Sequence, residues 1–237
     1  MLELPSLREM LDAGVHFGHK TSRWSPKMAP YIFTSKSGVH VINLEKTLEE
    51  VKKAVDFIEK ESEAGKVFIF VGTKKQSGEI VKEAAISCGM PYVDTRWLGG
   101  TITNFEAIRT SARKLKQQKE ELENENSVLT KSELSKIRKE AIRGEKHLGG
   151  LIGVERKPDG LLLFGSYDEK IALREAKKEN ISVVALVDTN ADPTLVDYPV
   201  PANDDATKSV KLFGQLFAKA ILEGRAKRAK SEPTKEK

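Results

Sequence analysis

Basic and aromatic side chains alternate in a segment, residues 13–44, that contains no acidic residue although 32% of the chain is charged. Such a surface suits a polyanion: cations replace its counterions, no carboxylate repels phosphate, and flat rings pack on sugars or bases. The glycines and prolines of the segment argue against a regular helix, so we expect an irregular segment. Its candidate nucleic-acid contacts are His16, His19, Lys20, Arg23, Trp24, Lys27 and Tyr31.

Two further lysines, Lys74 and Lys75, follow an apolar run of strand length at residues 67–71. Backbone N–H groups and cations at the carboxyl end of a parallel strand form a common anion site. A nucleotide-binding loop is not supported, because Gly72 and Gly78 lack the Walker spacing and no GxGxxG is present. We therefore predict contacts with nucleic-acid phosphate and no nucleotide cofactor. Lysines at a solvated helix start are the alternative.

The sequence Arg96–Trp97–Leu98–Gly99–Gly100, followed by Asn104, is a third candidate contact. Arg96 would meet phosphate, and Trp97 either stacks on a base or braces the loop, with the glycines making the bend.

Carboxylates at predicted strand and helix ends suggest a rival activity. Asp188, Asp204 and Asp205, with His16 or His19, are candidate ligands of a divalent metal or the acid and base of a sheet-edge enzyme. Such residues also cap helices and build turns, and no Cys/His cluster strengthens the metal hypothesis. The single cysteine, Cys88, has no histidine nearby in sequence, so we expect a buried structural thiol.

Composition sets only broad limits on the class of protein. The chain has 237 residues, a formal net charge of +5 and a single cysteine, which suits a reducing cytoplasm. No apolar run approaches the ~18–20 residues of a membrane span, and the acidic N-terminus does not resemble a signal peptide. We therefore expect a cytoplasmic protein with no membrane partner.

Strand-like and helix-like patterns alternate outside residues 105–148, which predicts a parallel α/β sheet. Capping boxes at Ser6–Glu9 and Thr47–Glu50 predict two helix starts, and Gly224 is expected to end the last helix. The predicted strands are 38–43, 67–71, 92–94, 161–164 and 182–187, and the later helices are 76–87, 169–179 and 204–223.

Residues 105–148 read as an inserted antiparallel coiled-coil hairpin. Ile108, Leu115 and Leu122 repeat every seven residues, residues 123–127 form a turn, and Thr130 with Glu133 restarts a helix. Gly144 in the second helix costs ~1 kcal/mol relative to alanine. Residues 225–237 are basic and polar and are expected to form a flexible tail.

Six motifs occur in an order that resembles the bacterial small-subunit ribosomal protein S2 family. They are GVHFGHKTSRWSPKMAPYIF (14–33), FVGTKKQ (70–76), RWLGGTITNF (96–105), LGG (148–150), VDTNADP (187–193) and NDDA (203–206). The resemblance covers residues 5–225 and implies a flavodoxin-like, doubly wound sheet. It implies a discontinuous α/β domain of residues 1–104 and 149–224, with residues 13–44 facing rRNA and the hairpin inserted between the two parts.

The resemblance also implies a non-catalytic, structural role in the 30S subunit. Family members bind 16S rRNA late in assembly and help recruit ribosomal protein S1, and some are said to hold a metal ion. The hairpin indicates a bacterial or organellar type. Three alternatives stay open: an RNA-binding scaffold, a metal-dependent binder or enzyme, and an interaction module that binds a protein through its hairpin.

Overall fold

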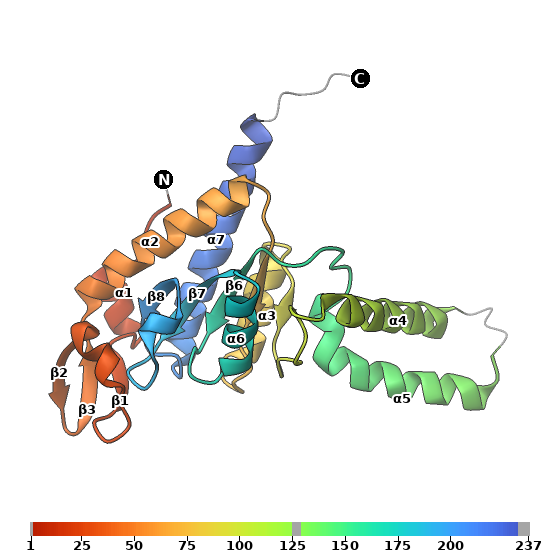
Figure 1. Ribbon diagram of the computed structural model, residues 1–237, viewed down its shortest axis with the longest axis horizontal. Coiled ribbons are helices and arrows are strands. Elements are labelled where there is room, and N and C mark those ends of the chain that lie inside the picture. Colours follow the sequence, from red (N-terminus) through yellow and green to blue (C-terminus); the bar gives the residue numbers. More distant parts are fainter. Residues whose placement is uncertain (1, 125–128, 232–237) are drawn as a thin grey trace.

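A five-stranded parallel sheet forms the centre of the computed structural model, which describes residues 2–124 and 129–231 (Figure 1). The strands lie in the order β5-β4-β6-β7-β8, which is the flavodoxin-like order with a reversal between β4 and β6. Their bounds are β4 Phe68–Val71, β5 Tyr92–Val93, β6 Gly160–Phe164, β7 Ser182–Val187 and β8 Tyr198–Pro201. The predicted α/β class is confirmed.

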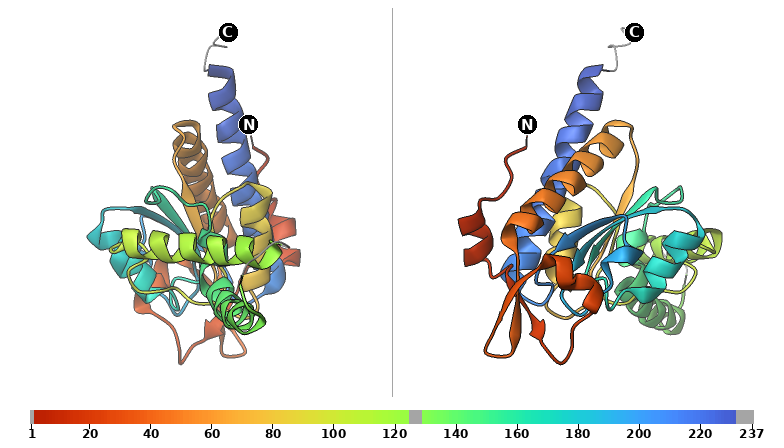
Figure 2. Two further views of the ribbon diagram at one scale, coloured as in Figure 1. Left: turned by 90° about the vertical axis from the view of Figure 1, so that its right-hand side faces the viewer. Right: turned by 60° about the vertical axis from the view of Figure 1, so that its left-hand side comes forward.

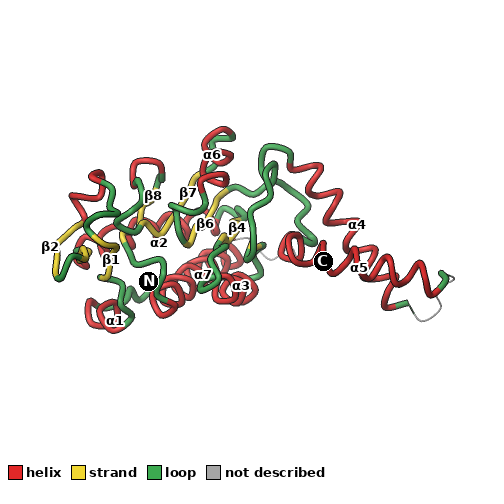
Figure 3. The backbone as a smooth tube through the Cα atoms, turned by 90° about the horizontal axis from the view of Figure 1, so that it is seen from below, coloured by secondary structure: helices red, strands yellow, loops and turns green. Residues whose placement is uncertain are grey.

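Alternate residues of each strand enter two separate cores, because successive side chains of a strand point to opposite faces. Phe68 and Phe70 face one core, whereas Ile69 and Val71 face the other. The first core packs against α2 (Leu44–Glu63), α3 (Gly78–Ser87) and α7 (Thr207–Ser231), and the second against α6 (Lys170–Lys178). Figure 3 shows α6 on one side of the strands and α3 and α7 on the other.

The acid-free segment is more regular than expected. It forms a three-stranded antiparallel sheet in the order β1-β3-β2, made of β1 Phe17–Lys20, β2 Ile32–Lys36 and β3 Val39–Ile42, with a 3-10 turn, η1, over Pro26–Tyr31. Only the third strand was predicted. Ser37 and Gly38 both have positive φ, at 52° and 76°, and this two-residue turn joins β2 to β3. The expectation of an irregular segment was therefore wrong, although no α-helix forms there.

Two predicted helix boundaries were wrong for packing reasons. Helix α2 begins at Leu44 with Asn43 as its cap, whereas the Thr47 hydroxyl is buried and donates to the carbonyl oxygen of Pro201 at 2.7 Å. Helix α7 continues past Gly224 to Ser231. A Cβ at Gly224 would lie 2.3 Å from the carbonyl oxygen of Glu59, so this glycine allows α2 and α7 to cross closely. Residues 232–237 of the predicted tail lie outside the described part.

Helices α4 (Phe105–Glu123) and α5 (Lys131–Leu148) pack against each other and project from the body as an arm (Figures 1 and 2). The predicted capping box of Thr130 and Glu133 opens α5. Residues 125–128 of the predicted turn lie outside the described residues, and the coiled-coil character of the pair stays a prediction. The buried side chains of the arm are small in number: Ala112, Leu115 and Ala141.

The remaining short elements lie around these layers. They are helix α1 (Leu7–Asp12), which opens on the predicted capping box of Ser6 and Glu9, and the 3-10 turns η2 (Gly149–Leu151) and η3 (Pro193–Leu195). Cys88 is buried, and burial raises the pKa of its thiol to about 11, as expected for a structural cysteine. Among the helices described, none has the length and apolar character needed to cross a membrane.

Candidate nucleic-acid interface and its polar support

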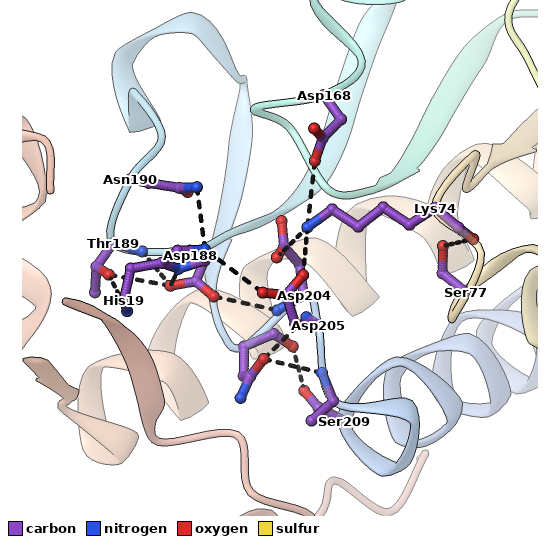
Figure 4. A network of polar contacts seen from close by, with 12 residues as sticks. His19, Lys74, Ser77, Asp168, Asp188, Thr189, Asn190, Asp204, Asp205 and Ser209 are labelled. Carbon is purple, nitrogen blue, oxygen red and sulfur yellow. Dashed lines mark hydrogen bonds and ion pairs between the residues drawn. The ribbon is translucent and has the colours of Figure 1, made fainter. Parts of the chain in front are cut away.

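The carboxyl ends of β4, β6, β7 and β8 bring distant parts of the chain together at one edge of the sheet, where the small sheet also lies. Lys74 follows β4, Asp168 follows β6, Asp188 follows β7, and Asp204 and Asp205 follow β8 (Figure 4). Strand ends of a parallel sheet meet at one edge, and the reversal between β4 and β6 opens space there. Polar residues far apart in sequence therefore form one network.

Lys74 lies at the centre of this network. Its Nζ is 2.6 Å from Oδ1 of Asp204, 2.8 Å from Oδ1 of Asp205 and 3.2 Å from Oδ2 of Asp168. Burial alone would lower the pKa of Lys74, but the carboxylates of Asp204 and Asp205 outweigh burial and raise it. Lys74 therefore stays protonated and joins the loops that follow three strands.

Asp204 is the most deeply buried acid of the network, with no exposed surface. Burial, and next the nearby carboxylate of Asp188, raise the pKa of Asp204 to about 7 despite the contact with Lys74. Its Oδ2 has no hydrogen-bond partner among the described residues. The charge on Asp204 therefore depends on Lys74, the cation that contacts it.

His19 attaches the small sheet to this edge. Its Nδ1 lies 3.0 Å from Oδ1 of Asp188, and its backbone N–H donates to Oγ1 of Thr189 at 2.7 Å. The close approach of the Asp188 carboxylate raises the pKa of the His19 imidazole. Gly18 permits this approach, because a Cβ there would lie 2.6 Å from Cγ2 of Thr189. The acid-free segment is therefore held at a fixed position on the α/β body.

These donors do not fit a metal site in the arrangement described. The ring of His16 packs against that of Phe17, with centroids 4.0 Å apart and planes tilted by 39°, and His16 is not among the residues that pair with Asp188, Asp204 or Asp205. The cation among the carboxylates of Asp204 and Asp205 is the Lys74 ammonium. Within residues 2–124 and 129–231, no group of three or more histidine, cysteine or acidic side chains is arranged to hold a metal ion.

A second buried acid, Glu175 on α6, holds the loop of residues 97–103. Its Oε1 accepts hydrogen bonds from the Trp97 indole N–H at 3.2 Å and the Gly100 N–H at 2.7 Å. Its Oε2 accepts from the N–H of Ile102 at 3.0 Å and from the N–H and hydroxyl of Thr103 at 3.1 and 3.0 Å. Burial would raise the pKa of Glu175, but these hydrogen bonds outweigh burial and lower it.

Several predicted contact residues do lie exposed at or beside this edge. Lys20 and Arg23 line a cavity of about 490 Å³ together with His19, Asp188 and Asp205. The described residues offer no carboxylate partner to four exposed cations, which are Lys20, Arg23, Lys75 and Arg96. Asn104 and Trp24 are also exposed, the latter at 37% with its ring against His40.

The other candidates are engaged inside the protein. Trp97 is 5% exposed, so of its two predicted roles the structure shows the bracing one. Lys27 remains exposed, but its Nζ lies 2.6 Å from Oδ2 of Asp192 and joins η1 to η3. His16 and Tyr31 are half-buried. Lys74 forms an ion pair with Asp204 inside the protein.

Sequence analysis missed Glu175, Asp168 and Thr189. Glu175 had a usable signal, because an acid beside Ala176 and three residues after Ala172 lies on the apolar face of its helix. Asp168 and Thr189 had none, since an acid or threonine in a loop is ordinary. Their roles arise only because the sheet brings their loops beside Lys74 and His19.

Replacing Lys74 by methionine should destabilise the protein by about 3 kcal/mol, because the buried Asp204 loses its cation. Urea unfolding measures this loss. Lys75→Met is the matched control and should change the free energy of unfolding by less than about 0.5 kcal/mol, since Lys75 is exposed. Adding Asp204→Asn to Lys74→Met should recover part of the stability. Equal effects of the two lysine substitutions would contradict the central role of Lys74.

Glu175→Gln should destabilise the protein by about 2–3 kcal/mol at pH 7, because an amide places N–H donors against N–H donors. The folded-state pKa of Glu175 lies below its ordinary value. Its stabilisation is therefore present above the pKa of the unfolded chain and is lost as the pH falls through the folded-state value. Thermal unfolding from pH 7 to pH 3 should show that the difference in unfolding temperature between the unmodified protein and Glu175→Gln becomes smaller below about pH 4. Lys178→Gln on the same helix is the control, and a difference independent of pH would count against this role.

One family model matches most of the chain. Residues 10–224 match the model for Ribosomal protein S2. That span contains the whole five-stranded sheet, the arm and the network around Lys74. Proteins of this family are structural rather than catalytic constituents of the small ribosomal subunit, where they associate with ribosomal RNA and other ribosomal proteins. The chain therefore belongs to the ribosomal protein S2 family and is a structural constituent of the small ribosomal subunit.

Proposed function

We propose that the protein binds folded 16S rRNA through the exposed cations at the carboxyl edge of its sheet and on the attached small sheet, without catalysing a reaction. One observation carries the proposal: the deeply buried acids of this edge are paired internally, whereas four of its cations are not. Asp188 and Asp204 are at most 1% exposed. Lys20, Arg23, Lys75 and Arg96 are exposed and have no carboxylate partner among the described residues.

The arrangement favours recognition of RNA shape over base sequence. A-form helices hide their major-groove edges, so a rigid protein meets mainly phosphates and 2′-hydroxyl groups. Two contacts hold the exposed cations in place. His19 fixes the small sheet on Asp188, and Glu175 fixes the loop that follows Arg96. Cations held at fixed spacing match a folded RNA better than cations on a flexible chain. Trp24, which is partly exposed, is the candidate for stacking on a base or sugar.

We assign the remaining candidates to supporting roles. Lys74 holds the carboxylates, Trp97 braces the 97–103 loop, and Lys27 joins two turns through Asp192. His16 and Tyr31 are half-buried within or beside the small sheet, and Asn104 lies exposed at the start of α4.

Membership of the family supports the finer parts of the proposal. We propose that the protein joins the subunit late in assembly, helps recruit ribosomal protein S1, and is of the bacterial or organellar type. The α4/α5 arm is the feature that favours this type. A divalent metal is not part of the proposal, because Lys74 already supplies the cation to Asp204 and Asp205.

The affinity for 16S rRNA should fall steeply as the salt concentration rises. The slope of log affinity against log salt should become shallower when cations at the carboxyl edge of the sheet are removed. Replacing Lys75 and Arg96 by alanine should reduce the slope of log affinity against log salt by about 1.5, since each phosphate contact contributes about 0.7–0.9. Filter binding across a salt series measures both slopes.

The matched control removes two exposed lysines from the opposite edge of the sheet. Lys177 and Lys178 lie at the end of α6, just before β7 begins. Their replacement by alanine should leave the slope close to that of the unmodified protein. If both double variants lower the slope equally, binding follows net charge and the proposed edge is not the interface.

A further inference from the structure

The arm carries an apolar groove that the proposed rRNA interface does not use. The groove lies between α4 and α5 and has a volume of about 660 Å³. Leu122 from α4 and Ala141 and Ile142 from α5 provide its apolar lining. Ala141 is 6% exposed, but Ile142 is 66% exposed, so its side chain faces solvent. A large apolar side chain in that position contributes favourable free energy only when another surface covers it and removes it from water.

The charges beside the groove are unequal. On the α4 side, Nζ of Lys119 lies 2.9 Å from Oε2 of Glu145, so that cation is neutralised within the arm. Arg138 and Lys146 lie four residues before and after Ile142 on α5, and both are exposed. Neither forms an ion pair with any residue in the described ranges. Glu123 is the lining acid without a described partner, so cations remain in excess.

The same excess extends along the exposed side of α5. Lys139 and Arg143 are also exposed and have no ion-pair partner in the part of the chain that the structure describes. Residues four apart on a helix share a face, so Ile142 lies in a row between Arg138 and Lys146. This surface combines an apolar centre with unneutralised positive charge. Its complement has apolar side chains in a row and carboxylates on the flank.

We propose that this groove docks an amphipathic helix of another protein, with the apolar stripe on Leu122 and Ile142 and carboxylates facing Arg138 and Lys146. Two packed helices leave a groove that accepts a third helix at the usual 8–10 Å spacing. A second copy of this chain fits less well, because its groove would present the same cations. RNA fits less well, because the side chain of Ile142 cannot form a hydrogen bond with the bases or phosphates of RNA. The proposal uses no residue of the rRNA interface and stands or falls separately from it.

The test uses the full-length protein and two synthetic helical peptides of about 18 residues, or five turns. Both carry leucines at positions 1, 4, 8, 11 and 15, and they differ only in having glutamates or lysines beside that stripe. Fluorescence anisotropy should show binding of the acidic peptide and binding at least about tenfold weaker for the basic one. The double variant Arg138→Glu with Lys146→Glu should reverse this preference. Equal binding of both peptides, or of neither, overturns the proposal.

Ile142→Gln tests the apolar part of the site and should weaken binding of the acidic peptide about tenfold. Ile171→Gln is the matched control, because Ile171 is 52% exposed on α6 and lies outside the arm. Both positions are exposed, so neither variant should change the unfolding temperature appreciably. Displacement of the acidic peptide by an RNA duplex would overturn the proposal in favour of RNA. Self-association that Ile142→Gln abolishes would overturn it in favour of a dimer.

Discussion

The architecture of the carboxyl edge of the sheet depends on one ammonium group, that of Lys74, among the carboxylates of Asp168, Asp204 and Asp205. Asp188 and Asp204 are at most 1% exposed, and a carboxylate removed from water to that extent needs a cation or several N–H donors. Asp204 obtains the cation from Lys74, whereas Asp188 obtains the N–H and hydroxyl of Thr189 and the imidazole of His19. Because these partners come from separate loops, satisfying two buried charges fixes the relative positions of β4, β7, β8 and the small sheet.

The buried carboxylate of Glu175 is stabilised mainly by backbone N–H groups of the 97–103 loop instead of by a cation. Glu175 is buried and receives five hydrogen bonds from that loop, three of them from backbone N–H groups. No cation is needed, and Arg96 at the start of the loop stays exposed. In both places an acid faces inward and fixes a loop, while a cation of that loop faces outward. The exposed surface of this edge is therefore positive for two reasons: its deeply buried acids, Asp188 and Asp204, have partners inside the protein, and the attached segment of residues 13–44 contains no acid.

Local patterns predicted the central layers well, whereas the close approaches needed the fold. The apolar runs at residues 67–71 and 182–187 are typical of strands covered on both faces, and β4 and β7 occupy them. Gly224 was misjudged because a helix-ending glycine and a glycine at a helix crossing look alike in sequence. The partners of Lys74 were unpredictable, since Asp204 lies 130 residues away and the contact exists only once β8 lies in the sheet. Glu175 alone left a local signal, as an acid on an apolar helix face.

Neighbouring cations with identical chemistry therefore have different roles according to the carboxylates that the fold brings near them. Lys74 is enclosed by three acids, while Lys75, the next residue, is exposed and has no described acidic partner. On the arm, Lys119 is neutralised by Glu145, while Lys146, the residue after that acid, is exposed and unneutralised by any described residue. A net charge of +5 is too small to indicate an RNA-binding protein by itself. The relevant quantity is the set of cations left without acids after folding, and both the sheet edge and α5 carry several of them.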